Sequence, residues 1–161
     1  MRIHVDGRFE AIQCGVGESV SIILHNDQRR LFSRRVAVLL PMGEVVRMSA
    51  GLRHGGAVKM SSVLAADEKK PQVMMMEADP KTGIVSLTST AYVSREEGSI
   101  TCAVTIGAAD LMAYLDDLAT SWLDFLTFRL VGAKADSKEE KQGRKEVAAL
   151  RKNLEAAGIV V

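Results

Sequence analysis

The sequence has few aromatic side chains and only two cysteines, and both shortages narrow its possible functions. Aromatic residues make up 4% of the 161 residues, so a surface that stacks many bases has little to be built from. Cys14 and Cys102 lie far apart, and no Cys/His ligand spacing accompanies them. A zinc site is therefore not predicted, and a buried thiol is expected for both cysteines, because each occurs in an apolar, strand-like run.

The sequence also lacks an excess of charge of one sign and any long apolar run. Its 21 basic and 20 acidic side chains give a formal net charge of +1, so any attraction to nucleic acid or to an anionic membrane must be local. No apolar run approaches the roughly 18 residues of a spanning helix, and the start, MRIHVDGRFE, has no signal-like apolar core. We expect a cytoplasmic protein that does not enter the membrane.

Catalytic motifs are missing as well. Neither GxxxxGK[ST] nor GxGxxG occurs, and the adjacent pairs Glu96-Glu97 and Asp116-Asp117 are expected on the solvated surface. None of the three histidines falls in a catalytic motif: His4, His25 and His54. His54, in RHGG, belongs either to a loop or to an anion contact made by glycine backbone. We expect no enzyme activity, no cofactor and no metal site.

The remaining composition is that of a globular domain with an appendage. Hydrophobic residues make up 47% and charged residues 25%, which is enough apolar surface for one core. After Gly132 the sequence becomes rich in interleaved charge. We therefore divide the chain into a strand-rich core domain, residues 1–131, and a linker with a charged C-terminal helix, residues 132–161.

The first half shows alternation and turn signals that predict strands. Strands are expected over residues 2–5 and 9–14, joined by Asp6-Gly7, and over 19–24 and 36–40. Residues 44–48 are predicted to pair with the last of these across a Pro41-Met42-Gly43 turn. Residues 51–56 read as a loop, residues 58–66 as a strand rather than a short helix, and residues 67–71 as an exposed connection.

The second half predicts an antiparallel meander followed by a helix. Strands over 72–78, 83–94 and 99–106 are separated by short turns. In the middle strand the better core face carries every second residue from the first valine: Val85, Leu87, Ser89, Ala91 and Val93. From residue 108 to 130 the apolar spacing becomes helical, which predicts one long helix or two closely joined helices covering the sheet.

Two features of these helices bear on packing. Trp122, Phe125 and Phe128 form an aromatic stripe, which at helical spacing is expected to be packed core. In the tail, Ser137 followed by Glu140 fits a capping box and Gly158 fits a helix stop. Its narrow seam is expected to dock on the same domain or on a partner: Val147, Leu150 and Leu154.

One segment concentrates positive charge beside an aromatic ring, and it is the candidate binding site. QRRLFSRR places four guanidinium groups around one phenylalanine: Arg29, Arg30, Phe32, Arg34 and Arg35. Guanidinium groups pair with phosphate and the ring could stack on a base, although the same residues could form a solvated basic turn. Further cations could extend this surface if their strands are neighbours: Arg2, Arg8, Arg47, Arg53 and Lys59.

The order of antiparallel strands followed by one amphipathic helix, over residues 72–131, resembles that of the Whirly and PC4-like single-stranded nucleic-acid-binding proteins. The resemblance is one of element order and implies binding of single-stranded DNA or RNA. We therefore predict an α+β protein that binds nucleic acid as a homo-oligomer. The alternative is a protein-interaction or assembly module, such as an inhibitor, adaptor or structural subunit, that binds through sheet edges and the C-terminal helix.

Overall fold

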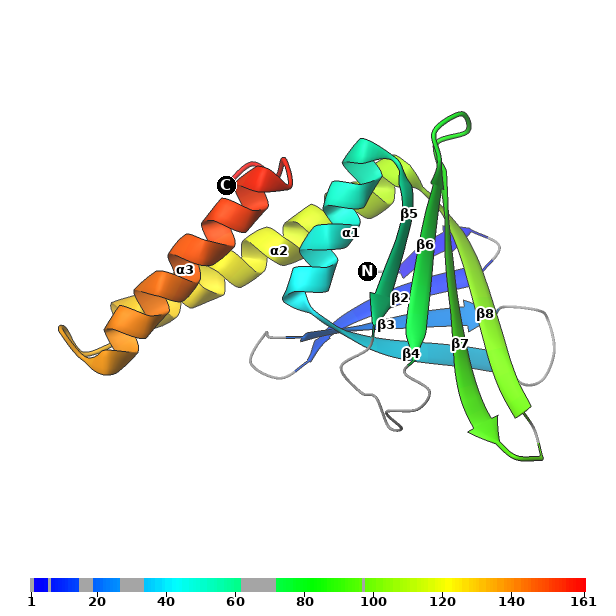
Figure 1. The fold of residues 1–161 in the computed structure, drawn as a ribbon, viewed down its shortest axis with the longest axis horizontal. Coiled ribbons are helices and arrows are strands. Elements are labelled where there is room, and N and C mark those ends of the chain that lie inside the picture. Colours follow the sequence, from blue (N-terminus) through cyan, green and yellow to red (C-terminus); the bar gives the residue numbers. More distant parts are fainter. Residues whose placement is uncertain (1, 6, 15–18, 27–33, 62–71, 97) are drawn as a thin grey trace.

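The computed structural model describes residues 2–5, 7–14, 19–26, 34–61, 72–96 and 98–161. It confirms the α+β class: two four-stranded antiparallel sheets and three helices (Figure 1). Each sheet is built from strands in sequence order and is followed by a helix. The unit of four strands and a helix therefore occurs twice, although the sequence shows no internal repeat.

The first sheet contains all four strands that the alternation predicts in the N-terminal part: β1 (Arg2–Val5), β2 (Gly7–Cys14), β3 (Ser19–Asn26) and β4 (Arg34–Pro41). Val5 pairs with Gly7, so β1 and β2 are antiparallel neighbours, as the predicted hairpin requires, while Asp6 of its turn lies outside the described residues. Alternate residues of β3 and β4 are buried, as their period of two requires: Val20, Ile22, Leu24, Val36, Val38 and Leu40.

The second sheet confirms the predicted meander: β5 (Gly56–Ser61), β6 (Val73–Asp79), β7 (Ile84–Ser94) and β8 (Gly98–Gly107). β5 settles the start of residues 58–66 as strand, whereas the rest of that segment and the predicted connection 67–71 lie outside the described residues. On β7 the predicted core face is buried at Val85, Leu87 and Ser89 and half-buried at Ala91. The structure does not describe the side chain of Val93.

Residues 42–54 form helix α1 (Met42–His54), so the predicted strand at 44–48 and the loop at 51–56 are wrong. Pro41 ends β4 and begins the helix, because its fixed φ of −66° suits the helix N-terminus as well as a turn. The buried residues follow helical spacing, which outweighs the Pro-X-Gly turn signal: Met42, Val45, Val46, Met48 and Ser49. The helix ends at Gly55 and Gly56, both at positive φ.

Gly51 lets α1 approach the second sheet closely. A Cβ atom there would clash with Cγ2 of Val58 on β5 and lie 3.3 Å from Cε of Met76. We expect Gly51→Ala to lower the free energy of unfolding by about 1–2 kcal/mol, since overpacking forces neighbours to shift. Gly43→Ala is the control, because no atom lies within 4 Å of its Cβ position, and it should stabilise the protein by about 0.4–1 kcal/mol. Equal urea denaturation curves for the two variants would contradict the close approach.

Helix α2 (Ala108–Val131) is a single helix of 24 residues that packs on β8 and α1. Leu111, Leu115 and Trp122 lie on its buried face, and Trp122 stacks on the half-buried Phe125 with centroids 5.1 Å apart. Phe128 is 77% exposed, so its assignment to the core is wrong. With 3.6 residues per turn, it lies on the opposite side of the helix from the buried row. The C-terminal part of α2 projects beyond the sheets (Figure 1).

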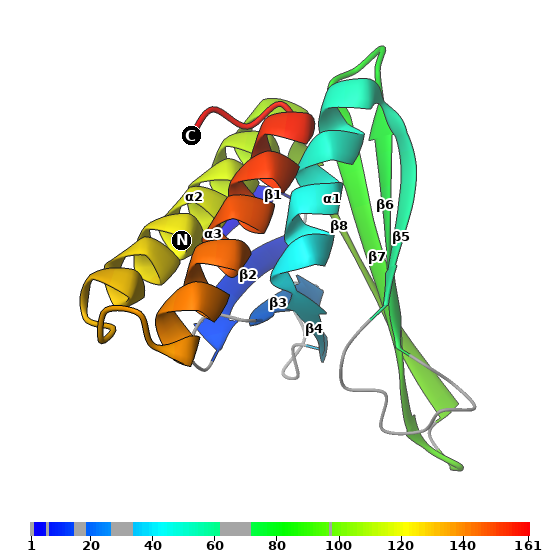
Figure 2. The ribbon, with the colours of Figure 1, turned by 60° about the vertical axis from the view of Figure 1, so that its left-hand side comes forward.

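Helix α3 (Lys138–Ala156) runs beside α2 (Figure 2) and confirms the sequence signals at both its ends. The Ser137 hydroxyl accepts a hydrogen bond from the Glu140 amide, and Gly158 follows the helix at φ 79°. The seam docks on the same chain: Leu154 is buried in the core cluster, and Val147 and Leu150 pack half-buried against it. Ion-paired Arg144 lowers the pKa of Glu140, which also accepts from the Asp136 amide.

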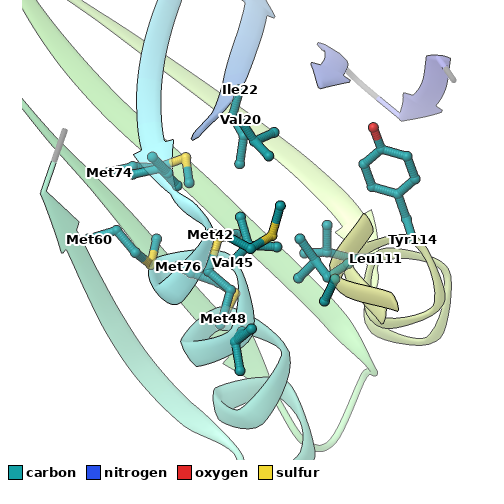
Figure 3. Close-up of a cluster of buried hydrophobic side chains, with 14 of the residues drawn as sticks. Val20, Ile22, Met42, Val45, Met48, Met60, Met74, Met76, Leu111 and Tyr114 are labelled. Atoms are coloured by element: carbon teal, nitrogen blue, oxygen red, sulfur yellow. The ribbon is translucent and has the colours of Figure 1, made fainter. Parts of the chain in front are cut away.

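The core lies where the two sheets and α1 meet. Strands of the first sheet cross those of the second (Figure 1), with contacts between β3 and β8 and between β4 and β7. Figure 3 shows side chains from both sheets and two helices filling this space, among them Val20, Met48 and Met76. In the part of the chain that the structure describes, no helix is long and apolar enough to cross a membrane.

Candidate nucleic-acid interface

The predicted arginine cluster falls at the connection between β3 and β4. Residues 27–33, with Arg29, Arg30 and Phe32, lie outside the described residues. Arg34 and Arg35 open β4, where their backbones pair with Asn26 and His25. β4 is an edge strand of the first sheet, so the backbone of Arg34 and Arg35 lies at one end of that edge strand. The role of the cluster in binding stays a prediction.

The cations that could extend this surface lie on different elements. Arg2 and Arg8 belong to β1 and β2, but their side chains lie outside the described ones. Arg47 lies on α1, forms an ion pair with Glu44 (2.9 Å) and donates to the carbonyl of Lys59 on β5. Arg47 and exposed Lys59 are therefore neighbours. The contact joins helix α1 to strand β5, whereas both residues were expected on strands.

Arg53 is withdrawn from any such surface by a pairing that the sequence did not predict. Its guanidinium group pairs with Asp116 on α2, with Nη1 3.1 Å from Oδ1 and Nη2 bonded to Oδ2. The buried Ser49 hydroxyl donates to the same carboxylate and accepts from Arg53. The Arg53 and Asp116 side chains are 22% and 25% exposed, so the expectation of a solvated Asp116 is wrong.

This three-residue network, the Ser49–Arg53–Asp116 lock, also reaches the C-terminus. A Cβ atom on Gly158 would lie 3.1 Å from Cδ of Arg53, so the turn after α3 packs on the arginine stem. Because α1, α2 and this turn meet at one side chain, the arrangement fits a structural role. The sequence carries no signal of this pairing, because Arg53 and Asp116 are 63 residues apart and local patterns do not reach that far.

In the part of the chain that the structure describes, no three His, Cys, Asp or Glu side chains gather as a metal site would require. His54 is exposed at the end of helix α1 rather than in a loop, and Cys102 is buried, as expected. The side chains of His4, His25 and Cys14 lie outside the described ones. Asp79 has a lowered pKa because the Lys81 amide and Thr82 donate to it within a surface turn.

The outward face of the second sheet is rich in hydroxyl groups and poor in charge. Across the strands, Lys59, Met75, Thr88 and Ala103 are in register, and Thr90 hydrogen-bonds to Thr101 at 2.8 Å. Among the outward positions with described side chains, only Lys59, Glu77 and Asp79 are charged. This face can donate hydrogen bonds, but it offers little attraction to phosphate.

No protein-family model, no curated protein and no solved structure matches this chain. The residues themselves must therefore carry the functional argument.

Proposed function

We propose that the protein binds nucleic acid, preferably single-stranded, and acts by binding rather than by catalysis. The observation that carries this proposal is the concentration of four arginines and one phenylalanine within residues 29–35, of which Arg34 and Arg35 open edge strand β4. Cations clustered at the end of an edge strand can reach a phosphate backbone without competition from neighbouring strands. Because the whole chain is nearly neutral, attraction to a nucleic acid depends on a local cluster of cations such as this one.

The repeated unit of four strands and a helix supports the same proposal. The element order that resembles the Whirly and PC4-like proteins over residues 72–131 also occurs over residues 2–54, where β1–β4 precede α1. This likeness concerns architecture, and one architecture can host several functions. It strengthens the case without assigning any binding residue.

The test is a titration of labelled oligonucleotides at several salt concentrations. Arg30→Ala with Arg34→Ala should weaken binding about equally for all sequences and lower the slope of log affinity against log salt by roughly one per lost phosphate contact. Lys81→Ala with Arg95→Ala is the control for net charge, since both residues are exposed in turns of the second sheet. Its slope should equal that of the wild type. If the wild-type protein binds no oligonucleotide at low salt, the proposal is wrong.

Phe32→Ala separates two roles of the aromatic ring in the cluster. A ring that stacks on a base should cost about 1–3 kcal/mol of binding while the fold stays intact. A ring in the core should instead cost about 3–5 kcal/mol of stability. Thermal melts beside the same titration distinguish the two outcomes.

A second candidate is a protein-interaction or assembly module that includes self-association. Phe128 and Val131 are 77% and 82% exposed on the projecting part of α2, and exposed apolar side chains of this size favour protein contacts when they are adjacent. This candidate also suits the predicted homo-oligomer. It takes the place of the first if oligonucleotide binding is absent.

A further inference from the structure

We propose that the outward face of α3 is a second phosphate-contacting surface, formed by a row of lysines; the inference rests on the proposed nucleic-acid binding. The row consists of Lys138, Lys141, Lys145 and Lys152. The offsets of three, seven and fourteen residues from the first lysine place all four on one side of a helix with 3.6 residues per turn. All four side chains are exposed.

The docking of α3 fixes which way this lysine row faces. Gly143, Val147 and Leu150 are partly buried and Leu154 fully buried on the opposite side of the helix, where α3 meets α2 and the core. A Cβ atom on Gly143 would clash with the side chain of Leu130 on α2, so the two helices are in close contact there. The lysine row consequently points away from α2 and from the core.

The carboxylates of α3 do not neutralise the row. Glu139 and Glu146 line a hollow between α3 and the end of α2, on the side away from the row. Glu140 is held by Arg144, with Nε 2.9 Å from Oε1. Glu155 alone borders the row, three residues after Lys152. None of the four lysines forms an ion pair with any residue that the structure describes.

The helix dipole does not account for the lysine row. Glu139 and Glu140 in the first turn of α3 suit the positive end of the dipole. Lys138 and Lys141 stand in the same region, where the dipole disfavours positive charge, and the last turn holds no basic residue.

The chemistry of the row fits a nucleic-acid backbone. Four lysines over fourteen residues span about 21 Å of helix, a length that reaches several phosphates, since even one strand of a duplex carries a phosphate about every 3.4 Å. Lysine contacts phosphate as a point charge and reads no sequence. Between the cations lie Ala148 and Ala149, so the face has no large apolar side chain to enter a bilayer, as a membrane-binding helix would need.

The experiment replaces all four lysines by glutamine in the full-length protein and titrates a labelled oligothymidine at several salt concentrations. We expect at least tenfold weaker binding at low salt, and a salt slope smaller by about 0.7 for each lost contact with a single strand. The matched control replaces four exposed cations elsewhere by glutamine: Lys81, Arg95, Arg129 and Lys134. Its affinity should stay within about twofold of the wild type if binding depends on position rather than net charge.

The outcomes separate this inference from the proposed function. If the lysine variant binds like the wild type, or if the control loses as much affinity, the lysine row is not a contact surface, although the protein still binds nucleic acid. If the wild type does not bind the oligonucleotide, both proposals fail. Lysine-dependent binding to phosphatidylserine vesicles, without oligonucleotide binding, would overturn them in favour of a membrane surface. Circular dichroism should show unchanged helix content in every variant.

Discussion

Replacing Leu154 by alanine is expected to lower the free energy of unfolding by about 2–5 kcal/mol, the range for a leucine removed from a packed core. Leu154 is 0% exposed and belongs to the same core cluster as the strands and α1. The Ile159 amide donates to the Leu154 carbonyl at 2.9 Å, and Ile159 is itself buried. The end of α3 and the residues after it thus anchor the tail on the core.

Urea denaturation of Leu154→Ala beside Val160→Ala measures this anchoring. Val160 is 93% exposed, so its truncation should change stability by less than about 0.5 kcal/mol. Equal, small effects would show that α3 docks weakly, as an appendage separable at residues 131/132 would. The division into residues 1–131 and 132–161 is still a proposal, and a truncation ending at Val131 that keeps a cooperative melt would support it.

Asp116→Ala is expected to cost about 2–3 kcal/mol, because it leaves the Arg53 guanidinium group and the buried Ser49 hydroxyl without their shared acceptor. The neighbouring Asp117 is exposed, which makes Asp117→Ala a control that removes the same charge from the same helix. Its effect should stay below about 0.5 kcal/mol. Similar losses for both variants would argue that helix charge, and not the Ser49–Arg53–Asp116 lock, sets the stability.

A double-mutant cycle with Arg53→Met isolates the pair. Each single variant should destabilise the protein, because it leaves the charge of the other residue unpaired. The double variant should cost less than the sum of the two, because both charges are then removed. Additive effects would mean that Arg53 contributes mainly through its packing under Gly158.

Local patterns were enough to predict most elements of this fold. The strands of both sheets and helix α2 follow periods of two and 3.6 residues, and short turns join them. Helix α1 was missed because Pro41 and Gly43 read as a turn, while the burial of Val45, Val46 and Ser49 became visible only with both sheets in place. Phe128 was misplaced because a spacing of three residues falls short of a full helical turn, so the stripe from Trp122 through Phe125 drifts off the buried face before it reaches Phe128.

The candidate sites also differ in how far the sequence reveals them. The Ser49–Arg53–Asp116 lock joins residues 63 positions apart and depends on how α1 and α2 cross, so sequence spacing carries no trace of it. The lysine row had a readable signal, since its members recur at helical spacing from Lys138, but the interleaved glutamates concealed it. Only the docking of Leu154 shows which face of α3 is outward.

The order of strands within each sheet has a consequence for how the chain folds. Every strand pairs with its neighbour in sequence, so each sheet forms from hairpins that close short loops. Contacts such as those between β3 and β8 or α1 and α2 span much longer stretches of chain. Closing long loops costs entropy before any contact compensates for it. We therefore expect the two sheets to form early, and the packing of the two sheets against each other, whose units Gly55 and Gly56 connect in the chain, to limit the folding rate.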